Sequence, residues 1–295
     1  MAFLASDELR GRGSATRDEH LAALFAASQF QALGLSPGGD GGSFIQTIQL
    51  PSPLPARTQQ RLAGFENVPR TQTWNAVAIL PGSDAADGVV LLTAHLDHLG
   101  IGPPDEAGDR IYNGADDDAS GTSAVLALAH VFAQGPRLRR TVVFALFGSE
   151  EIGGYGNAGF LARPPVPLGS IVATLEFEMI GRPDRSVGEF ALWFTGYERS
   201  NLGPELARHG APVVADPHPS QRFFQRSDNI ALARSGIVAH TISSFGLHPD
   251  YHRPSDELSK IDFPHLVRAV TSMVEPIRWF ANTDWRPSWN PGGRP

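Results

Sequence analysis

Five short polar clusters in this 295-residue chain carry side chains that can bind a metal ion or move a proton. Each lies where an apolar run of the chain ends, and histidine and carboxylate groups dominate them. Without any cysteine, these groups form an oxygen-rich ligand set with imidazole, which suits zinc without thiolate. Two such ions bridged by one carboxylate would lie about 3.5–4 Å apart and could share an activated water. The clusters are His95-Leu-Asp97-His98, Asp116-Asp117-Asp118, Glu150-Glu151, Glu176-Phe-Glu178, and the loop from His248 to Asp256 that contains Tyr251 and His252.

Each cluster alone also has a purely structural interpretation. His95 could be a core histidine held by Asp97, because residues two apart in an extended chain share a face. The three aspartates at 116–118 could cap the following helix or bind calcium, although the alternating spacing of an EF-hand is missing. Glu150 and Glu151 could lie in an exposed loop, but adjacent side chains diverge, so one could bind a metal while the other handles protons. The combination of all five clusters favours the metal site.

The elements that must position these clusters are those of an α/β domain. Apolar strands are predicted at residues 44–50, 73–80, 89–96, 140–147, 170–177, 190–195 and 237–242. Helices are predicted between Thr16 and Gly34, at 122–134, and from Asp262 onward. This alternation predicts a mixed, mostly parallel sheet flanked by helices on both faces, with ligands at the carboxyl ends of the strands. We expect one catalytic domain over residues 1–284 and an irregular C-terminal tail over 285–295.

Composition excludes several classes of protein. The formal charge is −7 and no basic run occurs, which argues against a nucleic-acid-binding surface. No apolar stretch approaches the roughly 20 residues that span a membrane. The absence of cysteine rules out a disulfide scaffold, an iron–sulfur cluster and a cysteine nucleophile. The residues after Met1 lack the basic start and apolar core of a signal peptide.

In chain order, the clusters resemble the M28 family of zinc aminopeptidases. The opening segment from Phe3 to Arg12 and the segment from Trp74 to Gly82 are also similar to that family, and the resemblance runs from residue 3 to residue 275. The motifs that carry it are Ala-His95-Leu-Asp97-His98-Leu-Gly, Asn113-Gly-Ala-Asp-Asp117-Asp-Ala-Ser-Gly121, Phe-Gly-Ser-Glu150-Glu151, Glu178-Met-Ile-Gly181, Arg226-Ser-Asp228-Asn and Asp250-Tyr-His252-Arg-Pro-Ser-Asp256.

The resemblance implies two Zn²⁺ ions per chain and the phosphorylase/hydrolase-like fold of zinc-dependent exopeptidases. By position, His95 and Glu178 would bind one zinc, Glu151 and His252 would bind the other, and Asp117 would bridge them. These five residues are the predicted metal ligands.

Four further residues receive roles from the same resemblance. Glu150 would act as general base and then general acid on the metal-bridging water. Tyr251 would stabilise the oxyanion of the tetrahedral intermediate, and Asp97 would orient His95. The peptide bond between Asp117 and Asp118 would be cis, as in relatives.

The chain departs from the family pattern in a few places. Glu178 stands where most relatives have aspartate, Asn229 where histidine is frequent, and Val238 where proline is usual. The protease-associated insert of larger members has no room between residues 51 and 72. None of these differences removes a predicted ligand.

The leading hypothesis is therefore a dinuclear zinc aminopeptidase that acts on peptides or aminoacyl compounds. Three alternatives share the fold: a single-zinc glutaminyl cyclase, a carboxypeptidase, and a non-catalytic binding module. We expect no nucleic-acid or membrane partner, and no pattern predicts an oligomeric state. The resemblance implies a secreted or periplasmic protein, because a chain that begins where such catalytic domains begin is expected from a trimmed precursor.

Overall fold

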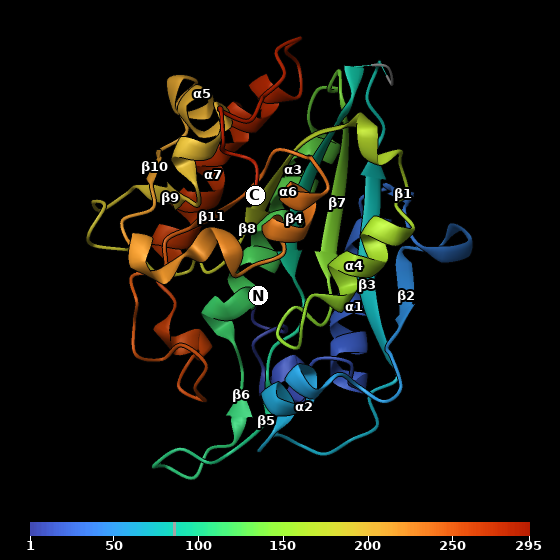
Figure 1. Cartoon of the computed structure of the whole chain (residues 1–295), viewed down its shortest axis with the longest axis vertical. Coiled ribbons are helices and arrows are strands. Elements are labelled where there is room, and N and C mark those ends of the chain that lie inside the picture. Colours follow the sequence, from blue (N-terminus) through green and yellow to red (C-terminus); the bar gives the residue numbers. More distant parts are fainter. Residues whose placement is uncertain (85–86) are drawn as a thin grey trace.

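The computed structural model describes residues 1–84 and 87–295 and is built around one twisted sheet (Figure 1). In the described residues the sheet has nine strands in the order β1-β3-β7-β4-β8-β11-β9-β10, with β2 added on β3. A separate two-stranded sheet joins β5 (Gly100–Ile101) to β6 (Ile111–Tyr112). The strands of the main sheet are β1 (Ser36–Pro37), β2 (Ile45–Gln49), β3 (Gln72–Leu80), β4 (Val89–His95), β7 (Thr141–Phe147), β8 (Ile171–Phe177), β9 (Leu192–Phe194), β10 (Val213–Ala215) and β11 (Ala239–Ser243).

Four central strands run parallel and bring their carboxyl ends to one edge. β7, β4, β8 and β11 are neighbours in the sheet, and each is parallel to the next. β3 is antiparallel to β7, and β9 is antiparallel to β11, so the sheet is mixed, as predicted. Every residue of β4 and β8 is buried, which explains why their sequences are almost continuously apolar.

Helices cover both faces of the sheet, and this confirms the predicted architecture. On one face, α1, α3, α5 and α7 pack in the main hydrophobic cluster with residues such as Leu92 and Phe144. On the other, α4 and α6 pack against residues such as Leu91 and Val143. The helices are α1 (Arg17–Ala32), α2 (Ala56–Leu62), α3 (Gly121–Gln134), α4 (Tyr155–Ala162), α5 (Leu202–Arg208), α6 (Asn229–Arg234) and α7 (Phe263–Phe280).

The helix starts predicted from capping residues are present, with one difference in detail. The Thr16 hydroxyl accepts hydrogen bonds from the Asp18 and Glu19 amides, and the Asp262 carboxylate accepts one from the His265 amide. The Glu19 side chain accepts from the amide of Ala15 at 2.6 Å, one residue before the position that a capping box requires.

Three short helices were not predicted. The connection after residue 51 contains α2, and α4 and α5 lie in segments for which no helix was expected. These helices have seven or eight residues each, too short for a helical period to stand out in the sequence. Residues 285–295 form no helix or strand, as expected, although Trp285 and Trp289 pack against the main cluster. Among the described residues, no helix has the length and apolar character needed to cross a membrane.

Candidate metal centre

The carboxyl ends of three neighbouring strands deliver the first set of polar side chains. His95 is the last residue of β4, Glu150 and Glu151 follow β7, and Glu178 follows β8. Register places His95 beside Phe147, the final residue of β7, so the first two groups leave the sheet side by side. Because parallel strands end at one edge, these side chains converge although they are far apart in sequence.

Asp117 joins these groups to the loop that carries His252. Asp117 lies in a π-helical segment, Ala115–Ser120, directly before α3, and its peptide bond to Asp118 is cis. One carboxylate oxygen, Oδ1, lies 3.0 Å from Nε2 of His95, and the other, Oδ2, lies 3.1 Å from Nε2 of His252. The two oxygens of one buried carboxylate therefore face two different histidines.

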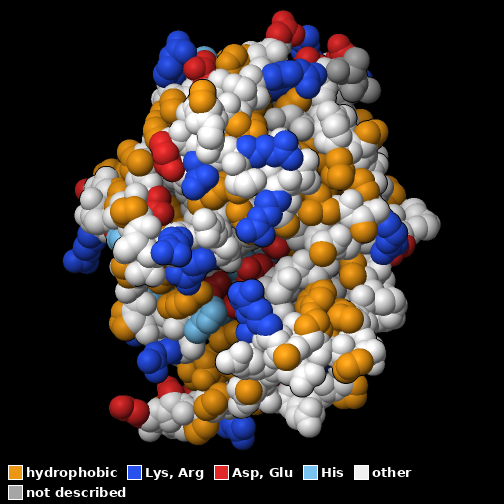
Figure 2. All heavy atoms as spheres, in the orientation of Figure 1, with side chains coloured by type: hydrophobic (Ala, Val, Ile, Leu, Met, Phe, Trp, Pro, Cys, Tyr) orange, Lys and Arg blue, Asp and Glu red, His pale blue; other side chains and the backbone are white. Residues whose placement is uncertain are grey.

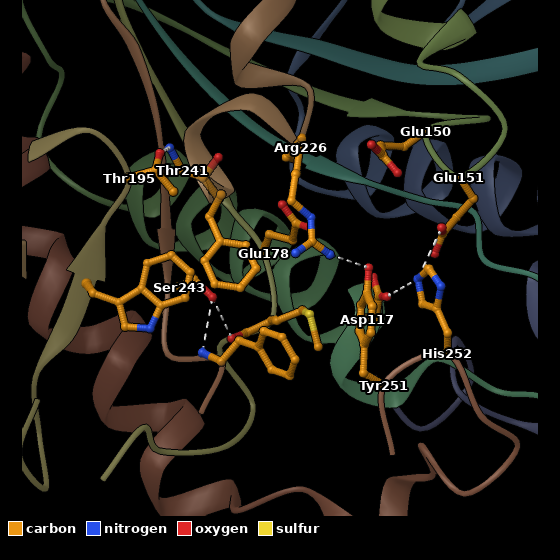
Figure 3. A pocket seen from close by; sticks show the side chains of 15 residues that line it. Asp117, Glu150, Glu151, Glu178, Thr195, Arg226, Thr241, Ser243, Tyr251 and His252 are labelled. Carbon is orange, nitrogen blue, oxygen red and sulfur yellow. Dashed lines mark hydrogen bonds and ion pairs between the residues drawn. The ribbon is translucent and has the colours of Figure 1, made fainter. Parts of the chain in front are cut away.

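The side chains form two groups that could each hold a metal ion. One group is His95, Asp117 and Glu178, and the other is His98, Asp117, Glu151 and His252, with all ligand atoms of a group within 4.8 Å of one another. Asp117 belongs to both groups. All five predicted ligands are thus brought together, and Figure 3 shows Asp117 between Glu178 and His252.

His98 is an additional member that the sequence did not single out as a ligand. Its Nδ1 lies 2.8 Å from Oε1 of Glu151 and 3.8 Å from Oδ2 of Asp117, and the side chain is fully buried. The available signal was its place three residues after His95. Strand periodicity does not extend past the end of β4, so the direction of this side chain could not be predicted.

The electrostatics of the centre fit a bound cation. Nε2 of His252 also lies 3.3 Å from Oε2 of Glu151, yet this buried nitrogen has no partner with hydrogen-bond geometry among the described residues. Burial opposes charge on Asp117, but the close imidazoles of His252 and His95 hold its pKa well below the usual value. Burial and the charge of Glu176 raise the pKa of Glu178 to about 7. Imidazole and carboxylate atoms at these separations are the donor set that zinc takes in the absence of thiolate.

Glu150 lies beside the two groups but belongs to neither. Its side chain is partly buried and lines the pocket above Asp117 and Glu178. Burial and the neighbouring Glu151 carboxylate raise its pKa well above that of an exposed glutamate. A carboxyl group that is close to the metal ligands, but is not itself one of them, is placed to exchange protons.

Asp97 holds the loop that carries these two glutamates. Its Oδ1 accepts a hydrogen bond from the Glu150 amide at 2.9 Å, and Oδ2 accepts from the Glu151 amide at 3.3 Å and from Ser14 Oγ at 2.5 Å. Oδ1 of Asp97 lies 3.7 Å from Nδ1 of His95, which is longer than the distances from the Asp97 carboxylate to the amides of the loop.

Asp118 and Asp256 fix the segment that carries Asp117. Oδ2 of Asp118 accepts from the amide of His95 at 3.3 Å, and Oδ1 accepts from the amide of Met179 at 3.1 Å, so Asp118 connects the ends of β4 and β8. The Asp256 carboxylate accepts from the amides of Asp116 and Asp117. These buried charge-assisted hydrogen bonds hold the backbone around the shared ligand.

A narrow pocket of about 40 Å³ lies next to the centre. Asp117, Glu150 and Glu178, which are labelled in Figure 3, line it together with the apolar side chains of Trp193 and Phe223. The ring of Tyr251 stacks on His252 with centroids 3.9 Å apart, and its hydroxyl accepts a hydrogen bond from Arg226 Nη2 at 3.3 Å. Arg226 and Phe245 also line this pocket.

Comparison with known proteins decides the family. The sequence pattern of peptidase family M28 matches residues 75–275 of the chain, which is more than half of its length. The chain belongs to peptidase family M28. Among curated proteins, the probable lipoprotein aminopeptidase LpqL of Mycobacterium tuberculosis is 32% identical over 171 residues, which are 58% of this chain and 29% of that protein. In this M28 relative and two others, the matched segment spans less than a third of the whole protein.

Solved structures share the M28 fold over almost the whole chain. BSAP, a zinc aminopeptidase from Bacillus subtilis, matches with a TM-score of 0.68 at 16% identity, over 96% of this chain and 94% of that one. A glutaminyl cyclase from Porphyromonas gingivalis matches with a TM-score of 0.67 at 16% identity, over 93% and 94% of the two chains. Because an aminopeptidase and a cyclase both have this fold, the reaction must be argued from the site.

A buried arginine beneath the centre was not identified from the sequence of this M28 chain. Arg12 is 1% exposed, and its guanidinium donates hydrogen bonds only to backbone carbonyls. The acceptors are Leu4 at 2.5 Å, Leu96 at 2.9 Å, Asn113 at 2.5 Å and Gly114 at 3.0 Å. Leu96 follows His95, and Gly114 precedes the segment with Asp117, so Arg12 links the two backbones that present these ligands.

We expect Arg12→Met to destabilise the protein by about 3–5 kcal/mol, because it leaves the buried carbonyls of Leu4, Leu96 and Asn113 without this donor, whereas the Gly114 carbonyl keeps the Ala119 amide. The measurement is the free energy of unfolding in urea for the metal-free chain. Arg12→Lys is the matched control: it keeps the charge but offers fewer donors, so its loss should be smaller. A change below about 1 kcal/mol for Arg12→Met would show that these contacts are dispensable.

Proposed function

We propose that this chain is a dinuclear zinc aminopeptidase, with residues 1–284 as its catalytic domain. The observation that carries the proposal is Asp117, whose two oxygens face His95 on one side and His252 on the other. A carboxylate shared between two donor groups is the arrangement that two adjacent ions require. His95 and Glu178 would hold one zinc, and Glu151 and His252 the other.

When bound, the zinc ions would supply Lewis-acid activation of the peptide carbonyl and of the attacking water. Glu150 takes the proton of that water and delivers it to the departing amine, and its raised pKa suits both steps. The Tyr251 hydroxyl, at the mouth of the pocket, would donate a hydrogen bond to the oxyanion. Asp97 keeps Glu150 in place through the Glu150 amide, and its proximity to His95 supports the ligand's orientation.

Cleavage at the N-terminus follows from the charge of the site. Asp117, Glu150, Glu151 and Glu178 line one small pocket. A carboxylate oxygen there that is not taken up by an ion would accept a hydrogen bond from the free α-ammonium group of a peptide, whereas an acylated N-terminus offers no charge and needs more room. The apolar pocket wall with Trp193 would take the side chain of the first residue.

A panel of substrates tests this function. Metal-loaded protein should release nitroaniline from several aminoacyl-nitroanilides, lose this activity with a chelator and regain it with zinc. The N-acetylated forms should be inert. Release of C-terminal residues from N-acetylated peptides would indicate a carboxypeptidase, and cyclisation of N-terminal glutamine without hydrolysis would indicate a cyclase. Absence of any turnover by zinc-loaded protein would favour a binding module.

The family resemblance also supports a secreted or periplasmic location, and one relative carries the name of a lipoprotein aminopeptidase. We therefore extend the proposal to peptides met outside the cytoplasm. Fractionation of the producing cells would test it, and a purely cytosolic protein would contradict it.

A further inference from the structure

A second, wider cavity opens directly onto the proposed metal site. It has a volume of about 460 Å³ and shares Glu150, Glu151, Arg226, Tyr251 and His252 with the narrow pocket. Its remaining walls include Arg57 and Arg61, the arginines of α2. A peptide whose first residue fills the narrow pocket must extend its remaining residues out of that pocket past Glu150, and this cavity is the space on the other side of Glu150. We call it the leaving-side groove.

The short helix α2 fixes two arginines on the wall of the groove. Arg57 and Arg61 are four residues apart, so they lie on the same face of α2. Nη1 of Arg61 donates to the carbonyl of Glu151 at 2.7 Å, and Thr58 Oγ1 donates to the carbonyl of Ile152 at 3.1 Å. These bonds attach α2 to the loop that carries Glu150 and Glu151. They fix the guanidinium group of Arg61 relative to the site, and Arg57 lies one turn earlier on the same face of the attached helix.

Arg57, Arg61 and Arg226 have no carboxylate partner in the part of the chain that the structure describes. Some exposed arginines of the described chain are paired with a carboxylate, for example Arg163 with Asp40, and others, such as Arg137, are not. Arg226 instead lies over the ring of Phe223, 4.8 Å from its centroid, and close to Tyr251. In Figure 2, acidic side chains lie at the bottom of a central hollow and basic side chains surround its rim.

Three arginines without a carboxylate partner line one groove of a chain whose net charge is −7. Like charges four residues apart on a helix repel each other, so α2 gains nothing from this pair by itself. A bound anion would relieve the repulsion. Guanidinium groups match a carboxylate in geometry as well as in charge.

We propose that the leaving-side groove binds a substrate carboxylate, and that the enzyme therefore prefers short peptides with a negative charge close after the cleaved bond. This inference rests on the proposed aminopeptidase function. The acidic centre would attract the ammonium end of a peptide, and the arginines of the groove would attract its carboxylate end. A dipeptide or tripeptide can reach both places at once. The groove shares Glu150 and Glu151 with the narrow pocket, so the carboxylate belongs to one of the residues directly after the cleaved bond. Its source is either a free C-terminus or an acidic side chain.

The test uses four peptides that share an N-terminal leucine: Leu-Gly-Gly, Leu-Gly-Gly-amide, Leu-Asp-Gly-amide and Leu-Lys-Gly-amide. With zinc-loaded protein, kcat/KM for Leu-Gly-Gly should exceed that for its amide by about tenfold at low salt, mainly through KM, and the ratio should shrink in 0.5 M salt. A similarly higher kcat/KM for Leu-Asp-Gly-amide than for Leu-Lys-Gly-amide would show that the groove also binds the carboxylate of an acidic side chain. An advantage for the free C-terminus alone would identify a di- and tripeptidase.

Arginine variants connect the preference to the groove. Arg57→Gln removes one positive charge from the groove and should bring the ratio of acid to amide closer to one, whereas Arg57→Lys keeps the charge and should preserve most of the ratio. Arg137→Gln, which removes an exposed arginine outside the groove, is the matched control and should leave the ratio unchanged. Equal kcat/KM for acid and amide in the unaltered enzyme would overturn this inference while leaving the aminopeptidase function intact. No hydrolysis of any of the four peptides would instead count against the function itself.

Discussion

Replacing Glu150 by glutamine is expected to lower kcat by about 10²–10⁴-fold while both zinc ions stay bound. The amide keeps the size of the side chain but cannot take a proton from water or return it to the leaving amine. Glu150 lies outside both ligand groups, so its loss should not open either metal position. The measurements are kcat for an aminoacyl-nitroanilide and zinc content by elemental analysis of the same preparation.

Glu151→Gln is the matched control, because it makes the same chemical change at the neighbouring residue. Glu151 contacts His98 at 2.8 Å and His252 at 3.3 Å, so this substitution should release zinc as well as lower activity. If Glu150→Gln lost zinc in proportion to activity, Glu150 would be a ligand, and the assignment of base and ligand would have to be reversed.

Asp117→Asn should have the second large effect, the loss of tight binding at both metal positions. The substitution removes the one negative charge that both groups share, and an amide nitrogen cannot bridge two cations. We expect fewer than 0.5 zinc per chain after dialysis, and activity reduced by more than about 10³-fold, since metal activation of the water is lost. Zinc per chain and residual kcat are measured together, with circular dichroism to confirm folding.

His252→Ala is the comparison for that result, because His252 belongs to only one group. It should remove about one zinc and leave the ion held by His95 and Glu178. Equal metal content in Asp117→Asn and the unaltered protein would contradict the shared-ligand geometry. Retention of two zinc ions by His252→Ala would refute the placement of His252.

The convergence of the proposed ligands could be predicted from sequence because strand ends are strongly marked. Residues 89–94 are apolar except for Thr93 and a histidine follows, so both the strand and the position of His95 at its end are visible. Parallel strands share an edge, which makes convergence with Glu151 and Glu178 a consequence of topology. The resemblance to the M28 family then supplied the role of each residue.

Other parts of the centre depend on tertiary contacts that leave no local pattern. Arg12 is an arginine in a short 3-10 segment, and only the folded chain shows four carbonyls around it. The arginines of α2 looked like ordinary polar residues of a loop, because a helix of seven residues shows barely two turns of periodicity. His98 lies just beyond the strand, where alternation no longer predicts direction.

The most direct test of the central claim is a zinc titration of metal-free protein. Activity on a leucyl-nitroanilide is followed while zinc is added in steps and bound zinc per chain is measured. We expect two zinc-binding events. Full activity should appear only when both groups around Asp117 hold an ion, at two zinc ions per chain. Full activity at one zinc per chain, with no further change at the second, would contradict the dinuclear centre.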